Sequence, residues 1–104
     1  MSDGEQVLAW HITVEHLPQP ERQYPFLKGR RYRADFAWPE QRLIAEVQGG
    51  AWTNGRHTRG AGYEADCERL NLATLAGWRI LYFTTDMVTD GRAVATLRKA
   101  LGVE

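Results

Sequence analysis

Two short segments near the middle of the chain alternate between polar and apolar residues, which is typical of β-strands. In residues 31–38 two arginines and Asp35 share one side, while alanine and aromatic residues share the other. Residues 42–48 place Glu46 and Gln48 on one side and apolar residues opposite. The Pro-Glu-Gln sequence between the segments is typical of a hairpin tip. The hairpin therefore gathers Asp35, Glu46 and Gln48 on one polar patch.

Weaker patterns on either side of this hairpin predict the other elements. In chain order they are a helix that ends before Pro18, an edge strand at 24–27, a helix at 63–76, a strand at 78–83 and a last helix from Thr85. The first strand is confined to an edge because it contains proline, which cannot donate to a ladder. The helix at 63–76 has its predicted apolar stripe on Tyr63, Cys67, Leu70 and Thr74.

These elements predict a fold class of α/β (α+β) type. The strand–helix–strand unit at 42–83 implies a right-handed crossover between parallel strands, and the hairpin adds antiparallel pairs. We therefore expect a mixed sheet of about four strands flanked by helices, in the order αβββαβα. The chain has 104 residues, enough for one modest core, so we expect a single domain over residues 1–104.

Composition excludes several classes of protein. With 43% hydrophobic and 25% charged residues, the chain has the balance of a folded soluble protein and not of a disordered one. A single cysteine, Cys67, excludes an internal disulfide and cannot anchor a zinc site alone. No apolar stretch approaches the roughly 20 residues that cross a bilayer, and the N-terminus lacks the hydrophobic segment of a signal peptide. The expected compartment is the cytoplasm.

The formal net charge is zero, but the positive charges are unevenly placed. They cluster before and after the predicted hairpin strands, at Arg22, Lys28, Arg30, Arg31 and Arg33 and again at Arg56, His57 and Arg59. A basic stripe beside a carboxylate pair fits a phosphate backbone crossing the site. The alternative for each arginine is a solvated surface with ordinary ion pairs.

Residues 49–62 form a polar segment with five glycines. A loop of this length is uncommon in a small domain unless it is functional. Gly49 and Gly50 would let the backbone approach DNA closely, with a simple turn as the alternative. Trp52 would wedge into a groove or stack on a base, or it caps the sheet as a core residue.

The order of elements, with Asp35 followed by Glu46-Val47-Gln48, resembles the PD-(D/E)XK nuclease superfamily and its restriction-endonuclease-like fold. The chain is also similar to small phage and bacterial endonuclease-domain proteins of the very-short-patch-repair-like type. That similarity covers most of residues 20–88, through the runs 31–39, 46–52, 55–60, 66–71 and 77–79. Two positions depart from the superfamily motif: Ala34 stands where the motif has proline, and Gln48 stands where it has lysine.

The resemblance implies a metal-dependent phosphodiesterase that uses Mg²⁺, with Mn²⁺ as a substitute. Its implied metal ligands are Asp35, Glu46 and the backbone carbonyl of Val47. Carboxylate and carbonyl oxygens are the ligands that a hard divalent cation prefers. From the residues alone, the alternative for both carboxylates is an ion pair with an arginine. That alternative is weaker for Glu46, because an ionised group in an apolar strand demands a strong partner.

Further catalytic residues are implied by position. Gln48 would hold the attacking water, or it is an ordinary polar residue at a strand end. Arg69 is the natural replacement for the missing lysine if its helix packs behind the sheet. His57 would shuttle a proton or bind metal, or it contacts phosphate only. Glu5 and Glu15 both lie on the first helix, where superfamily members place an additional acidic ligand, and the sequence does not choose between them.

The expected function is therefore a Mg²⁺-dependent DNA endonuclease, and fold analogy extends this to branched, nicked or damaged DNA in phage or bacterial recombination and repair. The expected nucleic-acid contacts are Arg31, Arg33, Gly49, Gly50, Trp52, Arg56 and Arg59. Two alternatives are a catalytically inactive DNA-binding module and a small interaction subunit of a larger DNA-processing complex. RNA as substrate and a homodimer as the active form both stay open.

Overall fold

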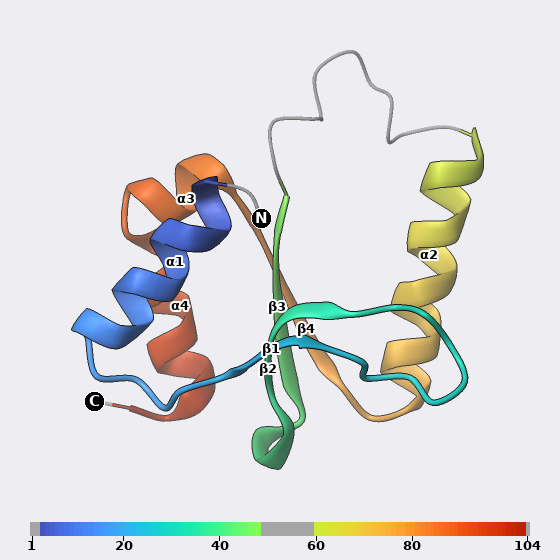
Figure 1. Cartoon of the computed structure of the whole chain (residues 1–104), viewed down its shortest axis with the longest axis horizontal. Coiled ribbons are helices and arrows are strands. Elements are labelled where there is room, and N and C mark those ends of the chain that lie inside the picture. Colours follow the sequence, from blue (N-terminus) through green and yellow to red (C-terminus); the bar gives the residue numbers. More distant parts are fainter. Residues whose placement is uncertain (1–2, 49–59, 104) are drawn as a thin grey trace.

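Figure 1 shows the computed structural model of the chain, which describes residues 3–48 and 60–103. Its elements are α1 (Asp3–Val14), β1 (Glu21–Tyr24), β2 (Ala34–Trp38), the 3₁₀ helix η1 (Pro39–Gln41), β3 (Leu43–Gln48), α2 (Gly60–Leu75), β4 (Arg79–Thr84), α3 (Thr85–Thr89) and α4 (Arg92–Leu101). The strands form one sheet in the order β1-β2-β3-β4, with β3 and β4 parallel and the other pairs antiparallel. The predicted fold class, a mixed four-stranded sheet flanked by helices, is confirmed.

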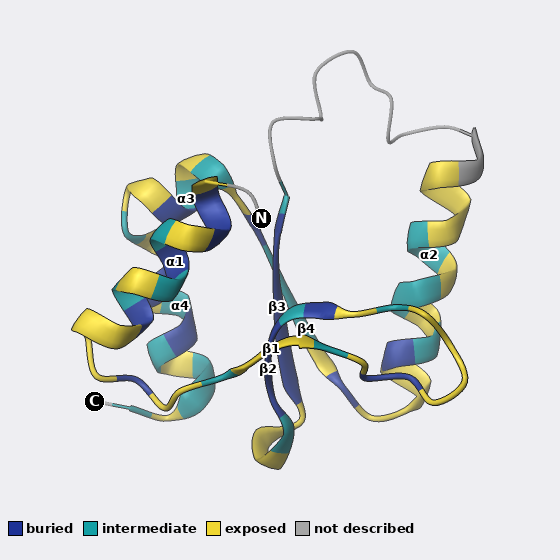
Figure 2. Cartoon of the chain, viewed as in Figure 1, coloured by how far each residue is buried: buried dark blue, intermediate teal, exposed yellow. Residues whose placement is uncertain are grey.

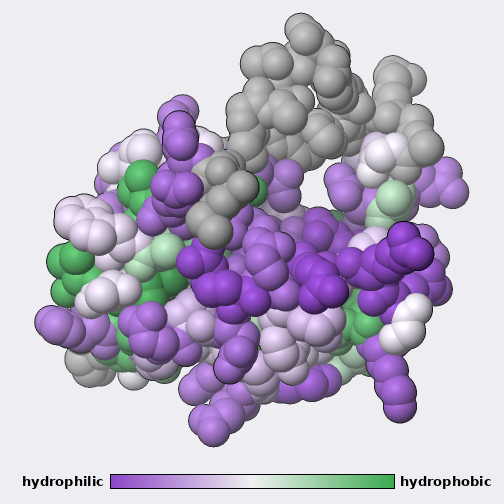
Figure 3. Space-filling view, in the orientation of Figure 1, coloured by the Kyte–Doolittle hydropathy of each residue, from purple (hydrophilic) through white to green (hydrophobic). Residues whose placement is uncertain are grey.

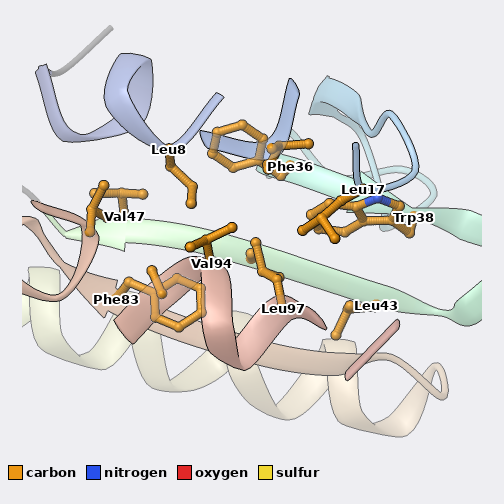
Figure 4. Close-up of a cluster of buried hydrophobic side chains, with 13 residues drawn as sticks. Leu8, Leu17, Phe36, Trp38, Leu43, Val47, Phe83, Val94 and Leu97 are labelled. Carbon is orange, nitrogen blue, oxygen red and sulfur yellow. The ribbon is translucent and has the colours of Figure 1, made fainter. Parts of the chain in front are cut away.

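Helices cover the two faces of the sheet unequally. Figure 1 shows α1, α3 and α4 on one side of the strands and α2 on the other. The three-helix side holds the larger core, in which Leu8 and Leu97 pack against Phe36 and other strand residues (Figure 4). Successive residues of β3 alternate between the two layers, and Ile44 belongs to the smaller core. The predicted alternation of the hairpin strands is therefore confirmed for β3.

Helix α2 packs more loosely than its sequence pattern predicts. Of its side chains that the structure describes, Ala73 alone is buried (Figure 2). The predicted stripe is wrong as a buried face: Tyr63 and Thr74 are exposed, while Cys67 and Leu70 are half-buried. The reason is that Leu72 and Ala73, near the C-terminus of α2, pack in the smaller core, while Tyr63, Cys67 and Leu70 line a cavity between α2 and β4.

Several helices and strands begin or end at residues other than those predicted. The first strand ends at Tyr24, before the proline, instead of containing it. Strand β2 begins at Ala34, so the arginines before it precede the regular pairing. The predicted last helix is two helices, because Gly91 takes a left-handed conformation (φ 89°) and the Asp90 carboxylate accepts the backbone N–H of Arg92. The observed order is thus αβββαβαα. No helix in the described ranges has the length and apolarity to span a membrane.

The β2–β3 hairpin sets the geometry of the polar patch. Its tip is η1, as the Pro-Glu-Gln turn predicts, and Arg42 closes it in a left-handed conformation (φ 53°). Phe36 pairs with Ala45 in the ladder. One step further from the tip, the same register sets Asp35 across from Glu46.

Candidate active site

Glu46 lies in the middle of the sheet and is held by an arginine from α2. Its side chain is 6% exposed, and Arg69 contacts both of its oxygens, with Nη2–Oε1 2.7 Å and Nη1–Oε2 2.8 Å. Arg69 Nη2 also donates to the hydroxyl of Tyr82 at 2.8 Å. Tyr82 is next to Glu46 because the parallel β3–β4 register pairs these two residues.

The ion pair bears on two expectations from the sequence. Arg69 reaches the sheet from its helix, which is the condition for replacing the motif lysine, and the replacement itself stays a prediction. The alternative for Glu46, an ion pair with an arginine, is what the structure contains. Tyr82, on the inner strand surface beside Glu46, is half-buried and accepts a hydrogen bond from Arg69.

Burial makes the ionised form of Glu46 costly despite its partner. Desolvation raises the pKa of Glu46 to about 7, with repulsion from Asp35 adding to the shift and Arg69 opposing it. Burial lowers the pKa of Arg69, but the attraction and hydrogen bond of Glu46, together with Tyr82 and Asp66, outweigh it, so the pKa of Arg69 is raised and the guanidinium stays charged. Burial also raises the pKa of Tyr82.

Asp35 has a different environment, built from neutral donors. The backbone N–H of Val47 donates to Asp35 Oδ2 at 3.0 Å, and the amide of Gln23 reaches Asp35 Oδ1 at 3.4 Å. Burial raises the pKa of Asp35, the Val47 hydrogen bond opposes this, and repulsion from Glu5 adds to it. Asp35 is half-buried, so it is both accessible and electrostatically disfavoured as an anion.

The acidic residue that α1 contributes is Glu5. It is 5% exposed and accepts hydrogen bonds on Oε2 from Arg22 Nη2 at 2.9 Å and from Gln23 Nε2 at 3.0 Å. Glu15 lies elsewhere and pairs with Arg98 at 3.1 Å.

The sequence contains a pattern that favours Glu5 over Glu15 as the acidic residue of the site. Glu5 falls three residues before Leu8, which is fully buried, and therefore on the buried face of α1. Arg22 and Gln23 were missed as site residues. Nothing local marks them, because their role depends on where α1 lies beside β1.

Gln48 lies at the edge of a cavity of about 390 Å³ between α2 and β4, on the strand face that also carries Glu46. Tyr82, Leu70 and Met87 give this cavity largely apolar walls, and Asp66 also lines it. Asp35 acts on Glu46 electrostatically. Glu46 and Gln48, two residues apart in β3, share the α2 side of the sheet, and Tyr82, the neighbour of Glu46, lines the same cavity as Gln48.

The predicted basic stripe is partly engaged in ion pairs. Arg22 bonds to Glu5, and Arg30 lies 3.6 Å from Glu68. Arg33 is exposed and donates to the backbone carbonyl of Gln23 at 3.5 Å. Hydrophilic residues gather over the β1 side of the sheet (Figure 3). Six further predicted residues lie outside the described part of the chain: Gly49, Gly50, Trp52, Arg56, His57 and Arg59.

Glu5, Asp35 and Glu46 are the carboxylates of the site that could act as metal ligands. Within residues 3–48 and 60–103, no group of three or more His, Cys, Asp or Glu side chains is arranged to hold a metal ion. Asp35 nevertheless repels both Glu5 and Glu46 electrostatically. Buried carboxylates that disfavour one another's charge have the donor chemistry that a hard divalent cation requires.

The chain is similar to known proteins in sequence and in fold. No family model matches the chain. Two curated Mycobacterium tuberculosis proteins, uncharacterized protein MT2308 (strain CDC 1551 / Oshkosh) and uncharacterized protein Rv2248 (strain ATCC 25618 / H37Rv), are each 35% identical over 95 residues. These alignments cover 86% of this chain but only 34% of each relative, so the chain spans about a third of their length.

A solved structure resembles almost the whole chain. It is the catalytic domain of the homing endonuclease I-Bth0305I, with a TM-score of 0.68 over 96% of this chain and 94% of that one. Sequence identity is 16%. The chain therefore has the fold of a nuclease domain.

Proposed function

We propose that this protein is a metal-dependent DNA endonuclease of the PD-(D/E)XK type, which hydrolyses phosphodiester bonds. The observation that carries the proposal is the pair of carboxylates on adjacent strands, the buried Glu46 and the half-buried Asp35, whose negative charge helps to raise the pKa of Glu46. Buried carboxylates that repel one another are costly in a purely structural role. The endonuclease domain with the same fold supports the reaction class.

The residues present fit a divalent cation. Asp35 and Glu46 would hold it, with Glu5 as the additional acid from α1 and the Val47 carbonyl as the ligand implied by the motif. Mg²⁺ is the proposed ion, and Mn²⁺ would substitute for it. When bound, such an ion activates water and offsets the charge that develops on the phosphate.

The remaining chemistry falls to the chain's own side chains. Arg69 supplies the positive charge that the motif lysine provides elsewhere, and its planar guanidinium suits a phosphate oxygen better than it suits proton abstraction. The Gln48 amide would hold a water molecule or donate to a phosphate oxygen. His57 is proposed as a proton shuttle. Arg31 and Arg33 would contact the DNA backbone, together with Gly49, Gly50, Trp52, Arg56 and Arg59.

The proposed partner is DNA, in branched, nicked or damaged form, with RNA as a competing substrate in the test below. Cutting both strands with so small a domain favours a homodimer. The proposed setting is bacterial or phage recombination and repair in the cytoplasm.

A second candidate is a catalytically inactive DNA-binding module. It is favoured by one observation: Arg69 contacts both oxygens of Glu46. Gln48, which is uncharged and stands where the motif has lysine, also favours the inactive module.

Cleavage assays separate these candidates. Labelled supercoiled plasmid, linear duplex, single strand, flap, four-way junction and RNA are incubated with Mg²⁺, Mn²⁺ or chelator. We expect metal-dependent cutting that falls roughly 10²- to 10³-fold in Asp35→Asn and Glu46→Ala, because each removes charge stabilisation at the reacting phosphate. Glu15→Ala is the matched control, since it removes an acid whose ion pair lies outside the site. Binding without cutting under every condition would leave the DNA-binding module as the better account.

A further inference from the structure

Two neighbouring residues of the edge strand β1 contact both carboxylate-bearing elements. Gln23 Nε2 donates to Glu5 on α1 at 3.0 Å and to Asp35 on β2 at 3.4 Å. One amide nitrogen thus bridges two acids that come from different parts of the chain. The amide nitrogen of glutamine carries two hydrogens and can donate to two acceptors at once. This contact therefore links α1 to the sheet at the site itself.

Arg22 supports the same arrangement from the adjacent position. Its Nη2 donates to Glu5 Oε2 at 2.9 Å, and its Nε donates to the backbone carbonyl of Asp35 at 3.3 Å. The guanidinium lies over the ring of Phe36, 4.5 Å from the centroid. Three separate contacts therefore orient this arginine, and two of them reach Glu5 and the backbone of Asp35.

The backbone at Gln23 is shaped to make the bridge. Its neighbours pair regularly, Arg22 with Phe36 and Tyr24 with Ala34, so Gln23 lies across from Asp35. Gln23 itself takes a left-handed conformation with φ 50°, which costs free energy for any residue with a Cβ. Arg33 donates to its carbonyl at 3.5 Å. Strain of this kind persists where surrounding contacts determine it, commonly at functional sites.

We propose that Arg22 and Gln23 are positioning residues that hold the Glu5 and Asp35 carboxylates in the convergent arrangement a divalent cation requires. The inference rests on the proposed function for the identity of the site. Without the amide bridge, two repelling carboxylates on separate elements turn away from each other. On cation binding, Gln23 keeps its shorter bond to Glu5 and releases its longer bond to Asp35.

The test compares metal affinity in variants of matched shape. Gln23→Met keeps the length of the side chain and the strained backbone but removes both donors. Gln41→Met makes the same exchange at an exposed residue of η1. Mn²⁺ binding is measured by electron paramagnetic resonance of the free ion, without DNA. We expect Gln23→Met to bind Mn²⁺ roughly 10- to 100-fold more weakly than wild type, and Gln41→Met to match wild type.

A metal titration of cleavage separates positioning from general damage. Activity of Gln23→Met should recover at high Mn²⁺ concentration, with kcat near that of wild type once the metal saturates. A merely structural loss would not be restored in this way. Arg22→Lys keeps a positive charge but loses the paired geometry, and we expect a loss of affinity in the same direction.

If Gln23→Met does not fold, Gln23→Asn replaces it. Asparagine tolerates left-handed backbone but is one methylene too short to span both acids, so the same loss is expected. Unchanged affinity in the folded variant overturns the inference, and so does tighter binding, which would make the amide a mere competitor of the metal.

The nuclease proposal can fail separately. Wild-type protein that binds Mn²⁺ but cuts nothing would refute the enzyme, while the affinity comparison would still decide the role of Gln23. Cutting that is identical in Gln23→Met and Gln41→Met at every metal concentration would refute the positioning role alone. A wild type that binds no Mn²⁺ refutes both.

Discussion

The two sheet carboxylates of this site have different kinds of hydrogen-bond partner. Glu46 is nearly buried and meets a full positive charge, with Arg69 on both of its oxygens. Asp35 is half-buried, and within the described residues its carboxylate accepts hydrogen bonds from neutral donors, the Val47 N–H and the Gln23 amide, while Arg69 contributes a weaker electrostatic attraction. A charged partner that packs behind the sheet stabilises the fold and competes with any incoming cation. Neutral donors leave the negative charge in place, so the Asp35 side of the site is the one prepared to receive a cation.

The comparison is tested most strongly by removing the charged partner. In Arg69→Leu, Glu46 loses its counter-ion while staying buried, and breaking a buried pair in this way costs about 3–5 kcal/mol. The loss should be largest above pH 7, where Glu46 would have to ionise, and smaller at pH 5, where it is protonated. Urea unfolding at both pH values measures it. Equal losses at pH 5 and pH 8 would contradict the ion-pair account.

The pH dependence of stability tests the burial of Glu46 itself. Its pKa is raised from 4.5 to about 7 in the folded protein, so the folded state binds the proton more tightly than the unfolded state. Stability from this group is fully present below about pH 4.5 and is lost as the pH rises through 7. A shift of this size corresponds to at most about 3 kcal/mol.

Glu46→Gln should flatten this decline, because the amide does not titrate. The check is the free energy of unfolding of both proteins, measured by urea titration between pH 4 and pH 8. Asp35 shifts in the same direction, so a smaller slope is expected to remain. Parallel curves for the two proteins would show that Glu46 is not the titrating group.

The smallest expected effect comes from removing the Tyr82 hydroxyl, which accepts a hydrogen bond from Arg69. Tyr82→Phe removes one hydrogen bond to Arg69 and leaves the ring in place, which should cost about 1 kcal/mol. Thermal unfolding measures the change, and Tyr63→Phe, on an exposed residue of α2, is the control. A cost as large as that of Arg69→Leu would mean that the tyrosine, and not the ion pair, is the main support of Arg69.

The two layers around the sheet explain why sequence patterns worked better for some elements than for others. Strand β3 of the hairpin was predicted with its facing correct, because alternation is a local property and its residues are buried. The stripe on α2 was wrong as a buried face, since apolar spacing alone does not say how closely a helix approaches a sheet. The last helical segment broke at Gly91, where a left-handed glycine and the Asp90 cap act together.

The residues of the candidate site also fall into two groups, those that the sequence pattern identified and those that only the structure identified. Asp35 and Glu46 were found from the sequence because charged residues are exceptional in apolar strands. The choice of Glu5 over Glu15 needed the position of α1, although the spacing of Glu5 to Leu8 carried a signal. Gln48 was expected on the same strand face as Glu46, and only the structure shows that this face opens on a cavity beside α2.

What the sequence determined by itself is the order of elements, the facing of the hairpin strands and the presence of two carboxylates in adjacent strands. These follow from local periodicity and from the cost of placing charge in an apolar segment. The tertiary structure alone decided that Arg69 neutralises Glu46, that Glu5 joins Asp35, and that Arg22 and Gln23 stand between them. Such contacts join residues 12 to 23 positions apart, and only the tertiary arrangement of helices and strands brings them together.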